Sequence, residues 1–280
     1  MRTPRQPSFE REEAFTSDSG PANYERYLAP YLFEPWAQVL LDTVGVQPGL
    51  RVLDVASGTG VVSRAAALRI GTGGRVLATD ISPSMIEFNA AHPPRPDAAP
   101  IETVVASATD LGGADGAFDV VLCQQGLPFF PDRVGALREM HRVLRRGGVA
   151  GVSVWSGHGA TMPFGPIHTV FGDLGVPEPF PGAWAMSSFV VAAAELTELL
   201  ARAGFTDVRC REIELVTHWP DLDHLTNVIL GTPFAGVLAS LSPDRQDEVR
   251  RLLRQHYEPF AMAVANVDVP TFATVAVATA

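Results

Sequence analysis

The sequence contains no lysine: all 21 basic residues among its 280 are arginine. Mechanisms that need a lysine amine are therefore excluded, which removes pyridoxal Schiff-base enzymes, the phosphate-binding loop of nucleotide triphosphatases and the Tyr/Lys pair of short-chain dehydrogenases. Basic residues are also outnumbered, since 31 Asp and Glu give a formal net charge of −10. An acidic chain is poorly suited to phosphate backbones, so we expect no nucleic-acid partner.

Cysteine and long apolar runs are scarce as well. Cys123 and Cys210 are the two cysteines, and no CxxC or Cys/His cluster accompanies them, so we expect neither a disulfide framework nor a metal site. No run of about 18 uncharged apolar residues occurs, which argues against a membrane-spanning helix. Residues 1–20 are polar and lack the apolar core of a signal peptide, so we interpret them as a flexible arm. A cytoplasmic protein without a membrane partner is the expectation.

Apolar runs alternate with helical patterns from residue 51 onward. Helices are expected at 59–70, 82–92, 132–146 and 193–205, and Pro35 is expected to divide 21–44 into two short helices. Strands are expected at 51–56, 75–80, 101–106, 118–125, 147–155, 206–219 and 271–280. Strands separated by helices predict an α/β fold with a doubly wound, mostly parallel sheet of seven strands.

Three segments lie outside this alternation, at 21–44, 156–191 and 220–270. The second is rich in Gly, Pro and aromatic residues, and the third holds two or three helices. We interpret residues 21–280 as a single domain in which these segments form a cap or lid over the functional edge of the sheet.

One motif combines an acid, a glycine-rich turn and a second acid. The first strand ends at Asp54 and runs through Gly58 and Gly60 into a helix, and the second strand ends at Asp80. Ligands of doubly wound sheets bind outside the carboxyl ends of the strands, and glycines let the backbone approach them closely. A carboxylate at the turn suits a cationic group, and one after the next strand can accept both hydroxyls of a ribose. The pattern predicts a nucleoside that carries an ammonium group.

Four motifs in this order resemble those of class I S-adenosylmethionine-dependent methyltransferases, and most of all the small-molecule branch of the ubiquinone/menaquinone methyltransferases. They are LDVASGTG (53–60), ATDISPSMIE (78–87), FDVVLCQQGLPFFPD (118–132) and LREMHRVLRRGGVAGVSVW (137–155). The resemblance implies a Rossmann-like methyltransferase fold, S-adenosylmethionine as cofactor and methyl transfer to a small molecule, with secondary metabolism as the setting.

The resemblance also implies roles for individual residues. Asp54 and the turn at Ala56, Ser57, Gly58 and Gly60 would hold the methionine moiety, with Tyr24 covering its carboxylate. The ribose would be bound by Asp80. The adenine would contact Ile81, Met85, Ser107 and Ala108, and the methionine end would face Cys123, Gln124 and Gln125. Met85 is equally well explained by core packing, and Cys123 by its small size.

The chain departs from the family pattern at two positions. Ala56 stands where the turn usually has its first glycine, and Ser107 stands where an aspartate commonly meets the adenine edge. The second change leaves the partner of the adenine amino group open.

The acceptor is expected to be compact and partly apolar, because the cap segments are rich in aromatic residues. Methylation of oxygen or carbon is favoured over nitrogen, with alignment of the reacting atoms as the main catalytic contribution. His158 follows the fifth strand directly and is the first candidate for a general base, with His168 second, although either could simply cap or pack.

Other interpretations remain open. A nicotinamide dehydrogenase would need GxGxxG, whereas position 63 is Ser and Asp54 would lie close to the pyrophosphate. A methyltransferase-like scaffold could bind the cofactor without transferring methyl, as a cyclase or an inactive partner. Protein or nucleic-acid methylation is disfavoured by the charge. The sequence leaves the oligomeric state open, with a homodimer as one candidate.

Overall fold

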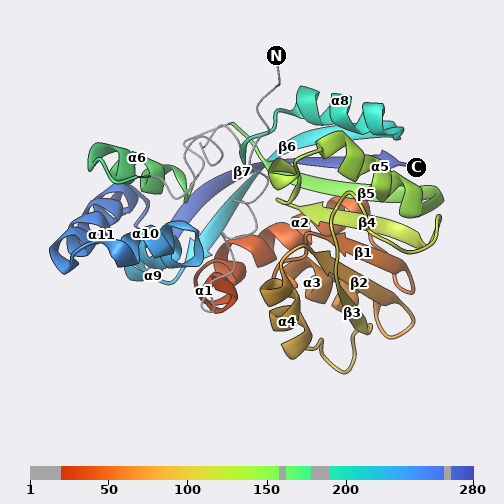
Figure 1. The fold of residues 1–280 in the computed structure, drawn as a ribbon, viewed down its shortest axis with the longest axis horizontal. Helices are drawn as coiled ribbons and strands as arrows, with labels where there is room; N and C mark the ends of the chain where they lie inside the picture. The colour runs from red at the N-terminus through yellow and green to blue at the C-terminus, as the bar shows by residue number, and fades with distance from the viewer. Residues whose placement is uncertain (1–19, 158–161, 178–188, 262–265) are drawn as a thin grey trace, which may run out of the picture.

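One mixed sheet organises the chain (Figure 1). The computed structural model describes residues 20–157, 162–177, 189–261 and 266–280. Within these residues the seven strands are ordered β3-β2-β1-β4-β5-β7-β6, which confirms the predicted fold class. Their bounds are β1 (Arg51–Val55), β2 (Arg75–Asp80), β3 (Ile101–Val105), β4 (Phe118–Gln124), β5 (Leu144–Trp155), β6 (Thr206–Trp219) and β7 (Val267–Thr279).

Strands β1 to β5 are parallel, and β7 runs antiparallel to both of its neighbours. Two strands begin earlier than predicted. Strand β5 starts at Leu144, which pairs with Phe118, and β7 starts at Val267, which pairs with Trp219 at the end of β6. Pairing across the sheet, which local patterns do not reveal, extends both strands.

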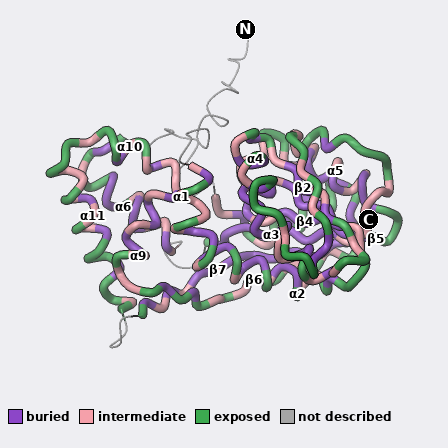
Figure 2. The backbone as a smooth tube through the Cα atoms, turned by 90° about the horizontal axis from the view of Figure 1, so that it is seen from below, coloured by how far each residue is buried: buried purple, intermediate pink, exposed green. Residues whose placement is uncertain are grey.

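Helices cover both faces of the sheet, as expected for buried parallel strands. Helices α2 (Glu34–Val44) and α3 (Val61–Ile70) share one hydrophobic cluster, and α5 (Arg133–Val143) and α8 (Ala193–Ala203) share a second one. Helix α4 (Pro83–Ala91) packs against β2 and β3. The burial of these inner faces is visible in Figure 2.

The N-terminal helical segment breaks at a different proline than predicted. Helix α1 (Gly20–Tyr27) is followed by a π-helical turn, η2 (Ala29–Phe33), and then by α2. Pro35 lies in the first turn of α2, where its missing N–H is tolerated. Pro30 lies inside η2, where the amide of Phe33 bonds to the carbonyl of Leu28, five residues earlier. A proline in a helix interior removes a hydrogen bond and crowds the preceding turn, so the wider turn forms there.

A group of helices lies beyond the carboxyl ends of the parallel strands (Figure 1). Its members are α6 (Gly165–Asp173), α9 (Leu222–Thr226), η4 (Asn227–Gly231), α10 (Phe234–Ser240), α11 (Pro243–Tyr257) and η5 (Glu258–Phe260), which we call the cap. Tyr257 Oη donates to the carbonyl of Pro163 at 2.7 Å, and Phe171 contacts Phe234 with ring centroids 4.9 Å apart. These contacts pack the described parts of the predicted cap segments 156–191 and 220–270 against each other.

Strands β6 and β7 connect the cap to the sheet. Trp155 at the end of β5 pairs with Ala273, whereas β7 begins at Val267 and pairs there with Trp219. The two strands therefore project past β5 as a two-stranded arm. Helix α1 packs against η4, whereas α2 packs on β5 and α3. The first part of the predicted cap segment 21–44 therefore lies with the cap, and its second part lies with the sheet.

Candidate cofactor site

The glycine-rich turn lies at the carboxyl ends of β1 and β2. The amide of Ser57 donates to the carbonyl of Thr79 at 2.9 Å, which fixes the turn to β2. Three of its residues have positive φ, with values of 56° at Ala56, 54° at Gly58 and 92° at Gly60. Such a backbone is open to glycine and strained for other residues, which explains the composition of the turn.

Two carboxylates flank this turn. Asp54 is fully buried and accepts a hydrogen bond from Ser63 Oγ at 2.5 Å. Asp80 accepts from the amide of Gly58 at 2.8 Å through one oxygen and from the amide of Ser82 at 2.9 Å through the other. The spacing predicted from the sequence thus brings both acids to one edge of the sheet.

Burial keeps both acids from ionising as easily as exposed ones. Burial raises the pKa of Asp54 to about 7, the charge of Asp80 adds to this shift, and the Ser63 hydrogen bond opposes it. Burial also raises the pKa of Asp80, against the hydrogen bonds from backbone amides. A cationic ligand at this edge would relieve the repulsion.

Close backbone approach explains two further glycines. A Cβ at Gly60 would lie 2.2 Å from Asn89 Oδ1, and a Cβ at Gly126 would lie 2.6 Å from the Cβ of Ala56. Asn89 therefore packs directly on the turn from helix α4. Sequence reasoning missed Asn89, because nothing in its local pattern marks it.

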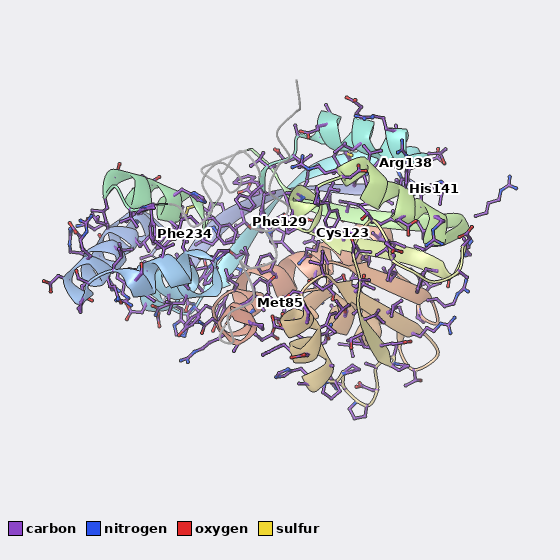
Figure 3. All side chains as sticks on the ribbon, viewed as in Figure 1. Met85, Cys123, Phe129, Arg138, His141 and Phe234 are labelled. Carbon is purple, nitrogen blue, oxygen red and sulfur yellow. The ribbon has the colours of Figure 1, made fainter. Side chains whose placement is uncertain are left out.

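The end of β4 supplies three of the predicted residues. Cys123 is fully buried and burial raises the pKa of its thiol to about 12, so it is a packing residue and not a nucleophile. Gln124 Nε2 donates to the carbonyl of Phe33 at 3.0 Å, and Gln125 Nε2 donates to Ser153 Oγ at 3.3 Å. Cys123 and Met85 lie on the side of the sheet that faces the cap (Figure 3).

The residues predicted for the adenine lie around the ends of β2 and β3. Ile81 is 49% exposed, a large value for an isoleucine, and Met85 is buried at 5%. Ser107 Oγ lies 3.0 Å from Thr109 Oγ1 and accepts from the Thr109 amide, and Ala108 packs against the second hydrophobic cluster. The burial of Met85 is compatible with either predicted role, core packing or adenine contact, while the Ile81 side chain is available to a ligand.

Tyr24 of α1 lies near the two acids. Its pKa is raised well above the usual value by burial first, and then by the charges of Glu25 and of the two site carboxylates. Its ring stacks on Phe33 with centroids 4.9 Å apart. Glu25, the next residue, forms an ion pair with Arg64 of α3, which the sequence analysis did not single out.

The histidine candidates are placed differently. His158 lies outside the described residues. His168 lies on α6 in the cap, where its ring meets Phe234 edge-on at 4.8 Å. Of the aromatic residues in the predicted cap segments and at their borders, Trp219, Phe171 and Phe234 are buried and form the core of the cap. Phe180 and Trp184 of the same segments lie outside the described residues.

Several buried polar atoms around the turn have no hydrogen-bond partner. They are Ser57 Oγ, Thr59 Oγ1, both polar atoms of Asn89, Gln124 Oε1 and Gln125 Oε1. Buried polar groups are ordinarily paired, so this cluster fits a polar ligand at the strand ends. In the same described residues no group of three or more His, Cys, Asp or Glu side chains is arranged to hold a metal ion. No described helix is both long and apolar enough to cross a bilayer.

Comparisons with known proteins identify the family of the chain. A family model described as "Methyltransferase domain" matches residues 53–152. A ubiquinone/menaquinone biosynthesis C-methyltransferase of Laribacter hongkongensis is 30% identical over 206 residues, which cover 72% of this chain and 74% of the relative. A nocamycin O-methyltransferase of Saccharothrix syringae is 34% identical over 121 residues, 43% of each chain. The chain spans about half the length of several curated relatives that it matches, among them an uncharacterised Mycobacterium tuberculosis protein.

Solved structures share the fold. The phosphoethanolamine N-methyltransferase 2 of Haemonchus contortus aligns with a TM-score of 0.62 at 17% identity, over 99% of this chain and 61% of that one. The [4+2]-cyclase SpnF aligns with a TM-score of 0.55 at 18% identity, over 88% of this chain and 80% of that one. At such identities the likeness concerns the fold alone. Fold, site and relatives together define the class: the chain belongs to the class I S-adenosylmethionine-dependent methyltransferases and, among them, resembles the ubiquinone/menaquinone branch.

Proposed function

We propose that this protein transfers a methyl group from S-adenosylmethionine to a small, partly apolar acceptor. The observation that supports this most is the pair of carboxylates, the buried Asp54 and the partly buried Asp80, on either side of a turn with positive φ at three positions. When bound, S-adenosylmethionine supplies an activated methyl group on a positively charged sulfur.

The residues of the chain then bind and orient. Asp54 faces the cationic methionine end, and Asp80, already held by the amides of Gly58 and Ser82, accepts the ribose hydroxyls. Ile81 offers an apolar surface to the adenine. Gln124 and Gln125 each have a buried amide oxygen without a partner, which suits the ammonium group.

Catalysis depends mainly on alignment of acceptor, methyl and sulfur and on exclusion of water, which can lower a barrier by about 7–11 kcal/mol. We infer that carbon or oxygen is methylated, since curated relatives are named as C-methyltransferases and an O-methyltransferase. A hydroxyl acceptor would need a base, for which His158 is the first candidate because it follows the end of β5 at Trp155. His168 is the second, and its contact with Phe234 favours a packing role instead.

The experiment incubates the purified protein with S-adenosylmethionine and a panel of phenolic, quinone-like and amine acceptors. We expect S-adenosylhomocysteine together with a product heavier by one methylene unit, both detected by mass spectrometry. Binding of the cofactor without any S-adenosylhomocysteine would instead support a non-methylating, cyclase-type function.

A binding measurement tests the placement of the cofactor. Hydrogen bonds to a charged group contribute about 1.5–3 kcal/mol, so Asp80→Ala should weaken S-adenosylhomocysteine binding at least tenfold in calorimetry. The control is Asp97→Ala, an exposed carboxylate in the loop before β3, which should bind as the wild type does. Unchanged affinity in Asp80→Ala would contradict the placement.

A further inference from the structure

Arg64 makes contacts to two parts of the cofactor site. It lies in the first turn of α3, directly after the glycine-rich turn. Its Nη1 donates to the carbonyl of Thr59 at 2.6 Å, and its Nη2 pairs with the carboxylate of Glu25 on α1. Both side chains of the pair are partly buried, at 22% and 26% exposure. The guanidinium of Arg64 therefore links the glycine-rich turn to helix α1.

The helix that Arg64 holds carries Tyr24, which lies near the two site acids. The far end of the same segment is held separately, because Gln124 Nε2 donates to the carbonyl of Phe33 at 3.0 Å. The stretch from Glu25 to Phe33 is thus attached once to the glycine-rich turn and once to the end of β4. These attachments fix the segment over the strand ends where the cofactor is proposed to bind.

A second ion pair on α3 provides a contrast. Arg69 pairs with Asp42 of α2 at 2.7 Å, with side-chain exposures of 32% and 68%. Exposed ion pairs of this kind contribute little to the stability of the fold. Glu25 differs because its second oxygen, Oε2, is buried without a hydrogen-bond partner. Removing Arg64 would leave a partly buried carboxylate without its ion-pair partner, which is costly, and α1 would move to solvate it.

We propose that Arg64 is a positioning residue for the cofactor: through Glu25 it holds α1 and Tyr24 over the site, and through the Thr59 carbonyl it holds the glycine-rich turn. The inference rests on the proposed function, since it concerns the same site. It predicts that the affinity for the cofactor, and not the rate of the chemical step, depends on the Glu25–Arg64 pair.

The test compares Arg64→Gln, Glu25→Gln and the double variant by calorimetry with S-adenosylhomocysteine. Each single variant should bind about tenfold more weakly, and the double variant no more weakly than either single one, because both changes break the same link. Arg64→Lys, which keeps the charge, should restore part of the loss. Arg69→Gln and Asp42→Asn are the matched controls and should bind as the wild type does.

Two further measurements separate positioning from general damage. Without any ligand, hydrogen exchange of residues 20–33 should be at least fivefold faster in Arg64→Gln than in the wild type or Arg69→Gln, while β1 and β4 remain protected. In the methyl-transfer assay, KM for S-adenosylmethionine should rise about tenfold with kcat changed less than threefold.

Three results would overturn the proposal. They are wild-type affinity and exchange in Arg64→Gln, fully additive losses in the double variant, and a loss for S-adenosylhomocysteine that is absent for 5′-methylthioadenosine. The last result would mean that Arg64 contacts the carboxylate of the cofactor directly. If the wild-type protein bound no S-adenosylhomocysteine, the proposed function would fail, and the ligand-free exchange measurement would still decide whether the pair holds α1.

Discussion

Ala56 carries a methyl group at a position where the backbone favours glycine. Its φ of 56° lies in the left-handed region, which costs an alanine about 1–2 kcal/mol. The methyl group occupies the space beside Gly126, where a second Cβ would lie only 2.6 Å away. Alanine at position 56, where the family pattern has glycine, is thus accommodated because position 126 is glycine.

This arrangement makes a prediction for stability. Ala56→Gly should raise the free energy of unfolding by about 0.5–1 kcal/mol, because relief of strain exceeds the added freedom of the unfolded chain. Gly126→Ala should lower it by about 1–3 kcal/mol through overpacking, and the double variant should recover most of that loss. Chemical denaturation measures all three, and a double variant as unstable as Gly126→Ala would contradict the account.

Asp54 predicts a pH dependence whose sign follows from its pKa. The folded protein holds the proton up to about pH 7, whereas an unfolded chain releases it near pH 4. Stability from this group is therefore present below about pH 4 and is lost as the pH rises to about 7. Asp54→Asn cannot titrate, so its stability relative to the wild type should improve over that range and level off above it. Denaturation from pH 4 to 8 tests this, and a constant difference would count against the shifted pKa.

Asp119 acts on the scale of strands. It accepts from the backbone and side chain of Arg51 on β1, at 2.9 and 3.1 Å, and from Arg145 on β5 at 2.7 Å. These hydrogen bonds hold its pKa well below the usual range. One carboxylate at the start of β4 therefore links three neighbouring strands at the edge of the sheet opposite the site.

We expect Asp119→Asn to lower the free energy of unfolding by about 1–2 kcal/mol at pH 7, since both arginines are partly exposed and screened. A lowered pKa gives stability that is present above about pH 4 and lost as the pH falls, so the variant and the wild type should converge in acid. Binding of S-adenosylhomocysteine should not change, because the opposite edge holds the site. A large loss of affinity would show that the strand link reaches the site.

At the scale of the whole molecule, we expect a substitution in the cap to change the preference among acceptors without changing the affinity for the cofactor. Phe164 lies just before α6 in the cap, where its ring meets that of Trp155 at the end of β5 with centroids 6.1 Å apart, and Phe164→Ala should change relative kcat/KM among acceptors at least fivefold. The dissociation constant of S-adenosylhomocysteine should stay within twofold, since the cofactor is proposed to bind at the strand ends and not in the cap. Leu252→Ala, on α11 at the far side of the cap, is the control. Equal losses of both affinities would contradict the role of the cap as the acceptor side.

The sequence predicts those features that local chemistry determines. Apolar runs between glycine turns indicated every strand, and the placement of Asp54 and Asp80 after successive strands indicated where they would meet. Contacts between distant segments were not predictable in this way. Glu25 and Arg64 are 39 residues apart and each looks like an ordinary exposed charge, so only the folded arrangement, which brings α1 near the start of α3, makes them partners. The π-helical turn at Pro30 likewise depends on what both flanking helices contact.

The parallel strands and the cap depend on β7 to different degrees. Strands β1 to β5 pair with one another, but among the described strands β6 pairs only with β7, although β7 comes later in the chain. A polypeptide cut before Val267 would lose the pairing of β7 with both β5 and β6, and the contact between η4 and α1 would remain to hold the cap helices that follow β6. During synthesis on the ribosome, strands β1 to β5 can thus assemble early, whereas the cap gains its attachment through β7 only after that strand has left the exit tunnel.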